Sequence, residues 1–78
     1  MKVTDYFLAT RQRPDRASIK DEWIQAACHF PDHQQTQPNG RIRRWASIPE
    51  AGGRYLRVVL LPDGETVQNA FFDRRFSP

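Results

Sequence analysis

The sequence predicts an α+β fold in which one main helix packs on a curved antiparallel sheet of three or four strands. Three observations carry this prediction. An apolar stripe of helical period lies within residues 18–30, alternating strand-like segments fill residues 33–72, and short turn signals separate them. A chain of 78 residues without internal repeats is expected to form one domain over residues 1–78.

The N-terminal part predicts the helix and what precedes it. Residues 2–10 hold a short apolar patch that suits either a strand or a first helical turn, and residues 11–16 read as a basic loop. Ser18 is expected to cap the helix, and Pro31 to end it. The predicted apolar stripe consists of Ile19, Trp23, Ala26, Ala27 and Phe30.

Four strand-like segments follow the helix. They span residues 33–37, 41–48, 54–61 and 66–72. Asn39-Gly40 predicts a hairpin between the first two, because both residues tolerate a positive φ. The segment 54–61 is apolar on both faces, which predicts a central strand that is covered on each side.

Side-chain alternation assigns the faces of these strands. In the segment 41–48, Arg44 interrupts the otherwise apolar face, which predicts either a sheet end or a bulge at that position. In the last segment the alternation places Val67 with Asn69 and Phe71, on the face opposite to Ala70.

The charge is unevenly distributed. Lys plus Arg number 12 and Asp plus Glu number 9, for a formal net charge of +3, yet residues 41–57 hold five arginines and the single acid Glu50. Arginine forks suit phosphate oxygens, and aromatic faces can stack on unpaired bases. A solvated sheet face is the alternative explanation. The expected nucleic-acid-binding residues are Arg41, Arg43, Arg44, Trp45, Arg54, Tyr55, Arg57 and Arg75.

Several classes of site find no support. The single cysteine, Cys28, excludes an internal disulfide, and no apolar run reaches the length of a membrane span, so a reduced, cytoplasmic protein without membrane contact is expected. His29 and His33 have helical spacing, but Pro31 lies between them and no further ligand joins them. We therefore expect neither a metal nor another cofactor.

Cleavage of RNA without a metal is one chemistry the residues could support. It needs cations that stabilise the phosphorane, a base for the 2′-hydroxyl and an acid for the leaving oxygen. Tyr6, Tyr55 and Asp73 are further groups that could move protons. The expected catalytic residues are Arg43, Arg57, His33 and Arg74.

The order of segments from the helix through Gly40–Trp45 and Arg54–Val59 to the turn at Asp63-Gly64 resembles BrnT-like proteins of the RelE/ParE-like toxin superfamily, over about residues 15–76. This resemblance implies a metal-independent endoribonuclease with its active surface on the concave sheet face, neutralised by a small antitoxin protein. No tyrosine follows Tyr55, so a tyrosine acid near the C-terminus is absent.

Two other functions remain open. One is a module that binds nucleic acid without cleaving it, through the same arginines. The other is a small homodimeric interaction or regulatory protein, which the low hydrophobic fraction of 38% favours. Its expected interface comprises Tyr6, Phe7, Phe71, Phe72 and Phe76.

Overall fold

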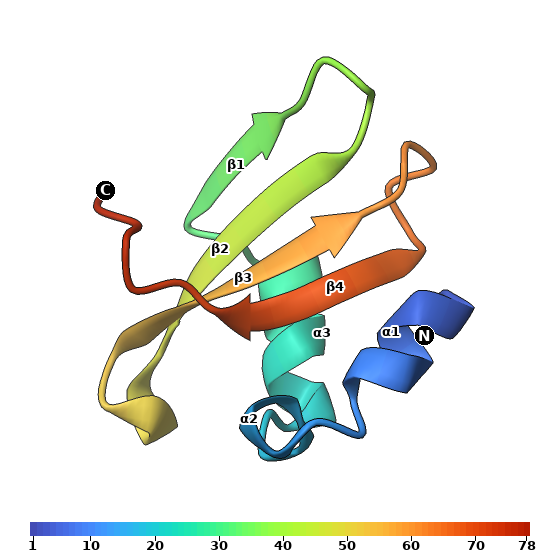
Figure 1. Ribbon diagram of the computed structural model, residues 1–78. Helices are drawn as coiled ribbons and strands as arrows, with labels where there is room; N and C mark the ends of the chain where they lie inside the picture. The colour runs from blue at the N-terminus through green and yellow to red at the C-terminus, as the bar shows by residue number, and fades with distance from the viewer.

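The computed structural model covers residues 1–78 and is α+β: four antiparallel strands form one sheet in the order β1-β2-β3-β4, and α3 packs behind it (Figure 1). Each predicted strand is confirmed, with one of its two bounds shifted by a single residue. The elements are α1 (Asp5–Thr10), α2 (Pro14–Ala17), α3 (Asp21–His29), β1 (His33–Thr36), β2 (Ile42–Ile48), the 3₁₀ helix η1 (Pro49–Ala51), β3 (Arg54–Leu60) and β4 (Val67–Phe72).

The N-terminal segment contributes both a strand-like contact and a helix, the two possibilities that its sequence left open. Val3 forms an isolated parallel bridge with Val67 of β4. The next residue, Thr4, caps α1, since its side chain accepts from the Phe7 N–H at 3.0 Å. Phe7 then enters the core. The segment thereby extends the sheet edge and fixes α1 beside β4.

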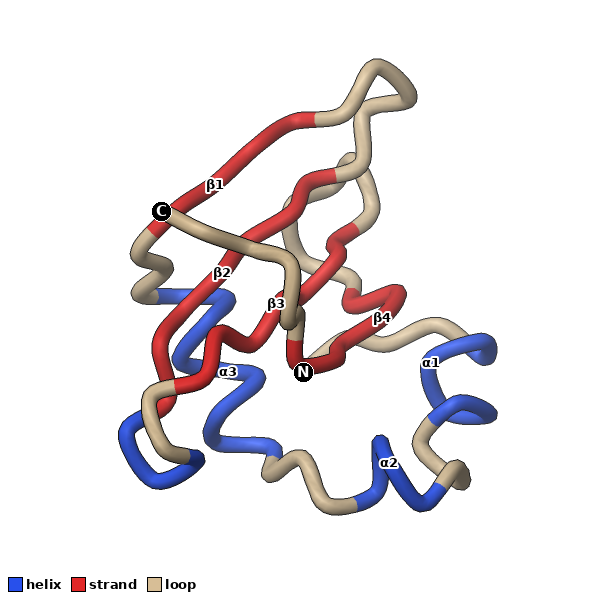
Figure 2. The backbone as a smooth tube through the Cα atoms, turned by 60° about the vertical axis from the view of Figure 1, so that its left-hand side comes forward, coloured by secondary structure: helices blue, strands red, loops and turns tan.

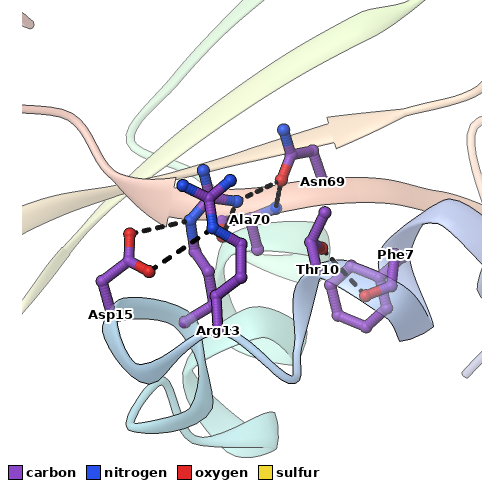
Figure 3. Close-up of polar contacts among 7 residues, drawn as sticks. Phe7, Thr10, Arg13, Asp15, Asn69 and Ala70 are labelled. Carbon is purple, nitrogen blue, oxygen red and sulfur yellow. Dashed lines mark hydrogen bonds and ion pairs between the residues drawn. The ribbon is translucent and has the colours of Figure 1, made fainter.

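The predicted basic loop contains a helix, so that expectation was wrong. Pro14 occupies the first turn of α2, where its missing N–H costs nothing. Arg16 donates to the Asn69 side-chain oxygen at 2.6 Å and to the Ala70 carbonyl at 3.4 Å. Figure 3 shows Asn69 and Ala70 on β4 above the α2 segment, with Asp15 on the other side of this contact. These bonds fasten α2 to the sheet.

The main helix begins later than expected. Ser18 ends α2, and α3 starts at Asp21 after Lys20, which makes no side-chain capping bond. Ile24 and Ala27 are its buried residues, whereas Phe30 is 82% exposed. Phe30 leaves the predicted stripe because the backbone turns out of the helix there, at φ −134° and ψ 58°.

A β-bulge changes which face of β4 meets the core. Val59 pairs with Asn69 but Leu60 pairs with Val67, so Gln68 is an extra residue in the ladder. Val67 consequently joins Ala70 on the helix-covered face, where both are buried. The alternation that placed Val67 with Asn69 was wrong for this reason.

The predicted hairpin between β1 and β2 is confirmed, but its turn differs. Gly40 has a φ of +87°, whereas no non-glycine residue, Asn39 included, has a positive φ. A Cβ at Gly40 would also lie 3.2 Å from Pro62 Cγ. Gly40 therefore suits this turn because of its positive φ, and a side chain there would also require Pro62 to shift slightly.

Candidate functional site

The five arginines of residues 41–57 do not share one surface. Arg43 and Arg57 project from β2 and β3 on the sheet face opposite α3, here called the open face, and Arg41 lies just before β2. Arg44 and Arg54 project on the helix-covered face instead. The expectation of a single cationic patch holds for three of the five.

Arg44 supports the end of the main helix. Its Nη1 donates to the Cys28 carbonyl at 2.6 Å, and its Nε donates to Gln34 Oε1 at 2.7 Å. It lies opposite Gln34 and Val58 in a regular ladder, so neither a sheet end nor a bulge explains it. The positive charge instead satisfies a carbonyl at the negative end of α3.

Arg54 makes its contacts within the chain, at the far end of the sheet. Its guanidinium lies 4.0 Å above the centre of the Phe72 ring, and its Nε donates to the Ala51 carbonyl at 3.0 Å. Phe72 in turn contacts Trp23 of α3, with 6.0 Å between the ring centres. Arg54 thus faces away from Arg43 and Arg57.

The remaining arginines line a hollow on the open face. This arginine hollow has a volume of about 410 Å³. Arg43 lies directly opposite Val59 while Arg57 is two residues away on β3, which makes the two arginines diagonal neighbours. The polar and aromatic residues around the hollow are Tyr6, Gln37, Arg41, Arg43, Arg57, Gln68, Asn69 and Phe71.

The charge of the arginine hollow is only partly neutralised. Arg57 Nη1 lies 3.3 Å from Asp73 Oδ2, whereas Arg43 has no carboxylate partner. Arg43 Nη1 meets Gln35 Oε1 at 3.5 Å, and the Gln37 amide, turned so that its oxygen faces Arg43, accepts from Nη2 at 2.6 Å. Neutral partners leave the charge of Arg43 available to an anion.

Arg57 is under electrostatic strain in this position. Burial lowers its pKa, the neighbouring charge of Arg43 lowers it further, and Asp73 acts in the opposite direction. Its Nε is shielded from water and has no acceptor. An anion with several acceptor oxygens would offset the repulsion between Arg43 and Arg57, since such groups suit the arginine fork.

An aromatic cluster adjoins the arginine hollow on the open face. Phe76 lies flat on Trp45, with 4.5 Å between ring centres and 16° between planes, and meets Tyr55 at 5.1 Å and His33 at 5.2 Å. His33, Trp45 and Tyr55 are here called the aromatic cradle. Trp45 is only 6% exposed, because the Phe76 ring covers it, so in this conformation it offers no free stacking surface.

Of the four expected catalytic residues, Arg43 and Arg57 come together at the arginine hollow, whereas His33 and Arg74 do not line it. His33, Trp45 and Arg57 follow one another across the sheet in register. With Trp45 between them, His33 and Arg57 are separated by two strand spacings, roughly 10 Å. Arg74 and Arg75 lie exposed after β4, without an ion pair. Nor do three His, Cys, Asp or Glu side chains gather as metal ligands would.

The phenylalanines of the expected dimer interface mostly pack against other residues of the same chain. Phe7 is buried, Phe72 packs against the core, and Phe76 covers Trp45. Phe71 lies between the guanidinium groups of Arg16 and Arg57, at 5.1 and 4.7 Å from them. Of the five residues, Tyr6 alone is more than half exposed, at 53%.

Sequence reasoning missed two features of this face. Tyr6 was considered as a proton carrier, but its position at the arginine hollow depends on the contact between α1 and β4, for which the sequence holds no local signal. The aromatic Phe76 three residues after Asp73 was the one available hint of a tail that returns to the sheet.

Comparisons of the chain with family models, with curated proteins and with solved structures found no match. None of the helices has the length and apolar character that crossing a bilayer requires.

Proposed function

We propose that the protein binds single-stranded RNA at the arginine hollow. The observation that carries this proposal is the convergence of Arg41, Arg43 and Arg57 on one hollow of about 410 Å³, with a carboxylate beside only one of them. Tyr6 at its rim can stack on an unpaired base, as base-stacking aromatics do in single-strand binders. The Gln37 amide can both donate to and accept from a 2′-hydroxyl.

Binding of a labelled oligouridylate, followed by fluorescence anisotropy, tests this proposal. Arg43→Gln and Arg57→Gln should each weaken binding by about tenfold, because a charge-assisted contact contributes about 1.5 kcal/mol. Arg13→Gln is the matched control, since Arg13 is an exposed arginine that does not line the arginine hollow and lies 3.8 Å from Asp15. Equal losses in all three variants would show nonspecific attraction and would contradict the proposal.

RNA cleavage is a second candidate function, and the position of Tyr6 favours it. Tyr6 is a group at the arginine hollow that can transfer a proton, and the arginines beside it could stabilise a phosphorane. Tyr6→Phe should then abolish cleavage of a long RNA while oligouridylate binding persists. Cleavage that continues in this variant at the original rate would exclude Tyr6 as the proton carrier.

We extend the proposal to a toxin of RelE-like fold that acts in the cytoplasm and is held inactive by a small antitoxin protein. The support is the order of elements, short helices followed by a four-stranded antiparallel meander, together with the open cationic face. Expression should then inhibit growth, and Arg43→Gln together with Arg57→Gln should relieve the inhibition. Unimpaired growth on full expression of the wild-type chain would leave RNA binding alone as the function.

A further inference from the structure

The six residues after β4 form a tail that returns over the open face. Figure 2 shows the chain running back from β4 across β3 and β2 toward β1, and Figure 1 shows the C-terminus near the β1 side of the sheet. The contacts of Phe76 with Trp45 and His33 agree with this path. The tail thus lies over the aromatic cradle, next to the arginine hollow.

Two side chains of the tail make its specific contacts. The Asp73 carboxylate accepts from the Trp45 indole Nε1 at 3.1 Å and from Arg57 Nη1 at 3.3 Å. Three residues further on, the Phe76 ring stacks on Trp45. The tail therefore presents an anionic group to Arg57 and a flat ring to Trp45. A nucleotide carries the same two groups, a phosphate and a base.

The other contacts of the tail are those of the Phe76 ring with Tyr55 and His33 and a bond from the Arg75 N–H to Asp73 Oδ1 at 3.1 Å. The last backbone–backbone hydrogen bond of the chain joins the Asp73 N–H to the Tyr55 carbonyl at 2.9 Å, and no such bond involves residues 74–78. A hollow of about 200 Å³ remains beside the tail, lined in part by Tyr55, Asp73 and Phe76. The tail can leave the cradle without breaking any strand pairing.

The cradle and the arginine hollow form one continuous track. Arg57 connects the two, since it lines the hollow with Arg43 and contacts Asp73 of the tail that covers the cradle. It also lies directly opposite Trp45 in the β2–β3 ladder. A single-stranded RNA whose phosphates contact Arg41, Arg43 and Arg57 therefore reaches Trp45 with its next nucleotide.

From this arrangement we infer that the aromatic cradle, together with Arg57, is a subsite for one unpaired base and its phosphate, and that Asp73 and Phe76 fill it by imitating that nucleotide. The inference rests on the proposed function and adds that the tail competes with RNA for the aromatic cradle. RNA must displace the tail to occupy the whole track. A tail that leaves the cradle free about a tenth of the time lowers the apparent affinity about tenfold.

Substitution of Phe76 in the full chain tests this competition. Phe76→Ala should raise the affinity for labelled oligouridylate, by about tenfold for a cradle that is free about a tenth of the time. Phe76→Leu keeps an apolar side chain over Trp45 without a ring, and should raise the affinity even if the alanine variant folds poorly. Phe30→Ala is the control, because Phe30 is a phenylalanine that is 82% exposed at the end of α3. Thermal unfolding identifies the folded variants.

Replacement of the Asp73 carboxylate tests whether this group takes the place of the nucleotide's phosphate. Asp73→Asn keeps an oxygen that can accept from the Trp45 indole, but it removes the negative charge at Arg57, so the affinity should rise by several-fold. Uridine monophosphate should also shift the indole N–H resonance of Trp45 in Phe76→Ala, while that of Trp23 serves as the internal reference.

The outcomes separate the two proposals. Higher affinity in the tail variants, together with the Trp45 shift, supports the subsite. Oligouridylate binding that requires Arg43 but is unchanged or weakened in folded Phe76 and Asp73 variants overturns the tail inference and leaves the arginine hollow as the RNA site. Absence of binding by the wild-type chain and by every tail variant overturns both.

Discussion

Replacing Arg43 by glutamine should reduce the salt dependence of RNA binding by one phosphate contact. Three arginines line the arginine hollow, and each phosphate contact on a single strand contributes a slope of about −0.7 to the dependence of log affinity on log salt. The wild-type slope should therefore be about −2, a loss of about 18-fold in affinity between roughly 50 and 200 mM salt. Arg43 has only neutral hydrogen-bond partners, so its whole contribution is available to the ligand.

The Arg43→Gln variant should give a slope of about −1.4, which is a loss of about sevenfold over the same salt range. Anisotropy titrations of labelled oligouridylate at several salt concentrations measure both slopes. Arg13→Gln keeps the net charge equal to that of Arg43→Gln and should retain the wild-type slope. If Arg13→Gln lowers the slope as much as Arg43→Gln does, binding follows net charge and the argument from the arginine hollow is refuted.

Three further predictions concern stability, measured by urea unfolding. Leu56→Ala should destabilise the fold by about 2–5 kcal/mol, because Leu56 is fully buried, and a loss under 1 kcal/mol would contradict its place in the core. Arg44→Met should cost about 1–3 kcal/mol by leaving the Cys28 carbonyl without its donor, whereas an unchanged midpoint would refute the helix-capping role. Hydrogen bonds from the Thr66 hydroxyl and from backbone N–H groups lower the pKa of Asp63 to about 2. Its stabilisation is therefore present above the ordinary carboxyl pKa and lost as pH falls toward 2, so Asp63→Ala should flatten the acid dependence of stability; a parallel decline would contradict this.

The local pattern was sufficient to predict the sheet. Strand side chains alternate with a period of two, so the sequence of β2 already separated Arg43 and Trp45 from Ala46 and Ile48. The turn residues then fixed the order of the strands, and an antiparallel meander with a helix on one face followed. That much was correct because each signal acts over a few neighbouring residues.

The candidate site was predicted only in part, because its members come from distant segments. Arg43 and Arg57 share the open face through strand pairing, which alternation predicts. The sequence predicts that Arg44 binds nucleic acid, because no local signal shows that the end of α3 lies close enough to accept its hydrogen bond. The sequence does not show that Phe76 covers Trp45, because the return of the tail involves no strand pairing.

What the sequence alone determined is the α+β class, the four strands and the side of β2 on which each arginine points, since backbone periodicity and turn chemistry are local. The tertiary structure decided which of these side chains remain available to a ligand. It placed Tyr6 at the arginine hollow and Phe76 on Trp45, and the bulge at Gln68 turned Val67 into the core. Contacts between segments far apart in the chain depend on how every element packs, and no short stretch of sequence contains that information.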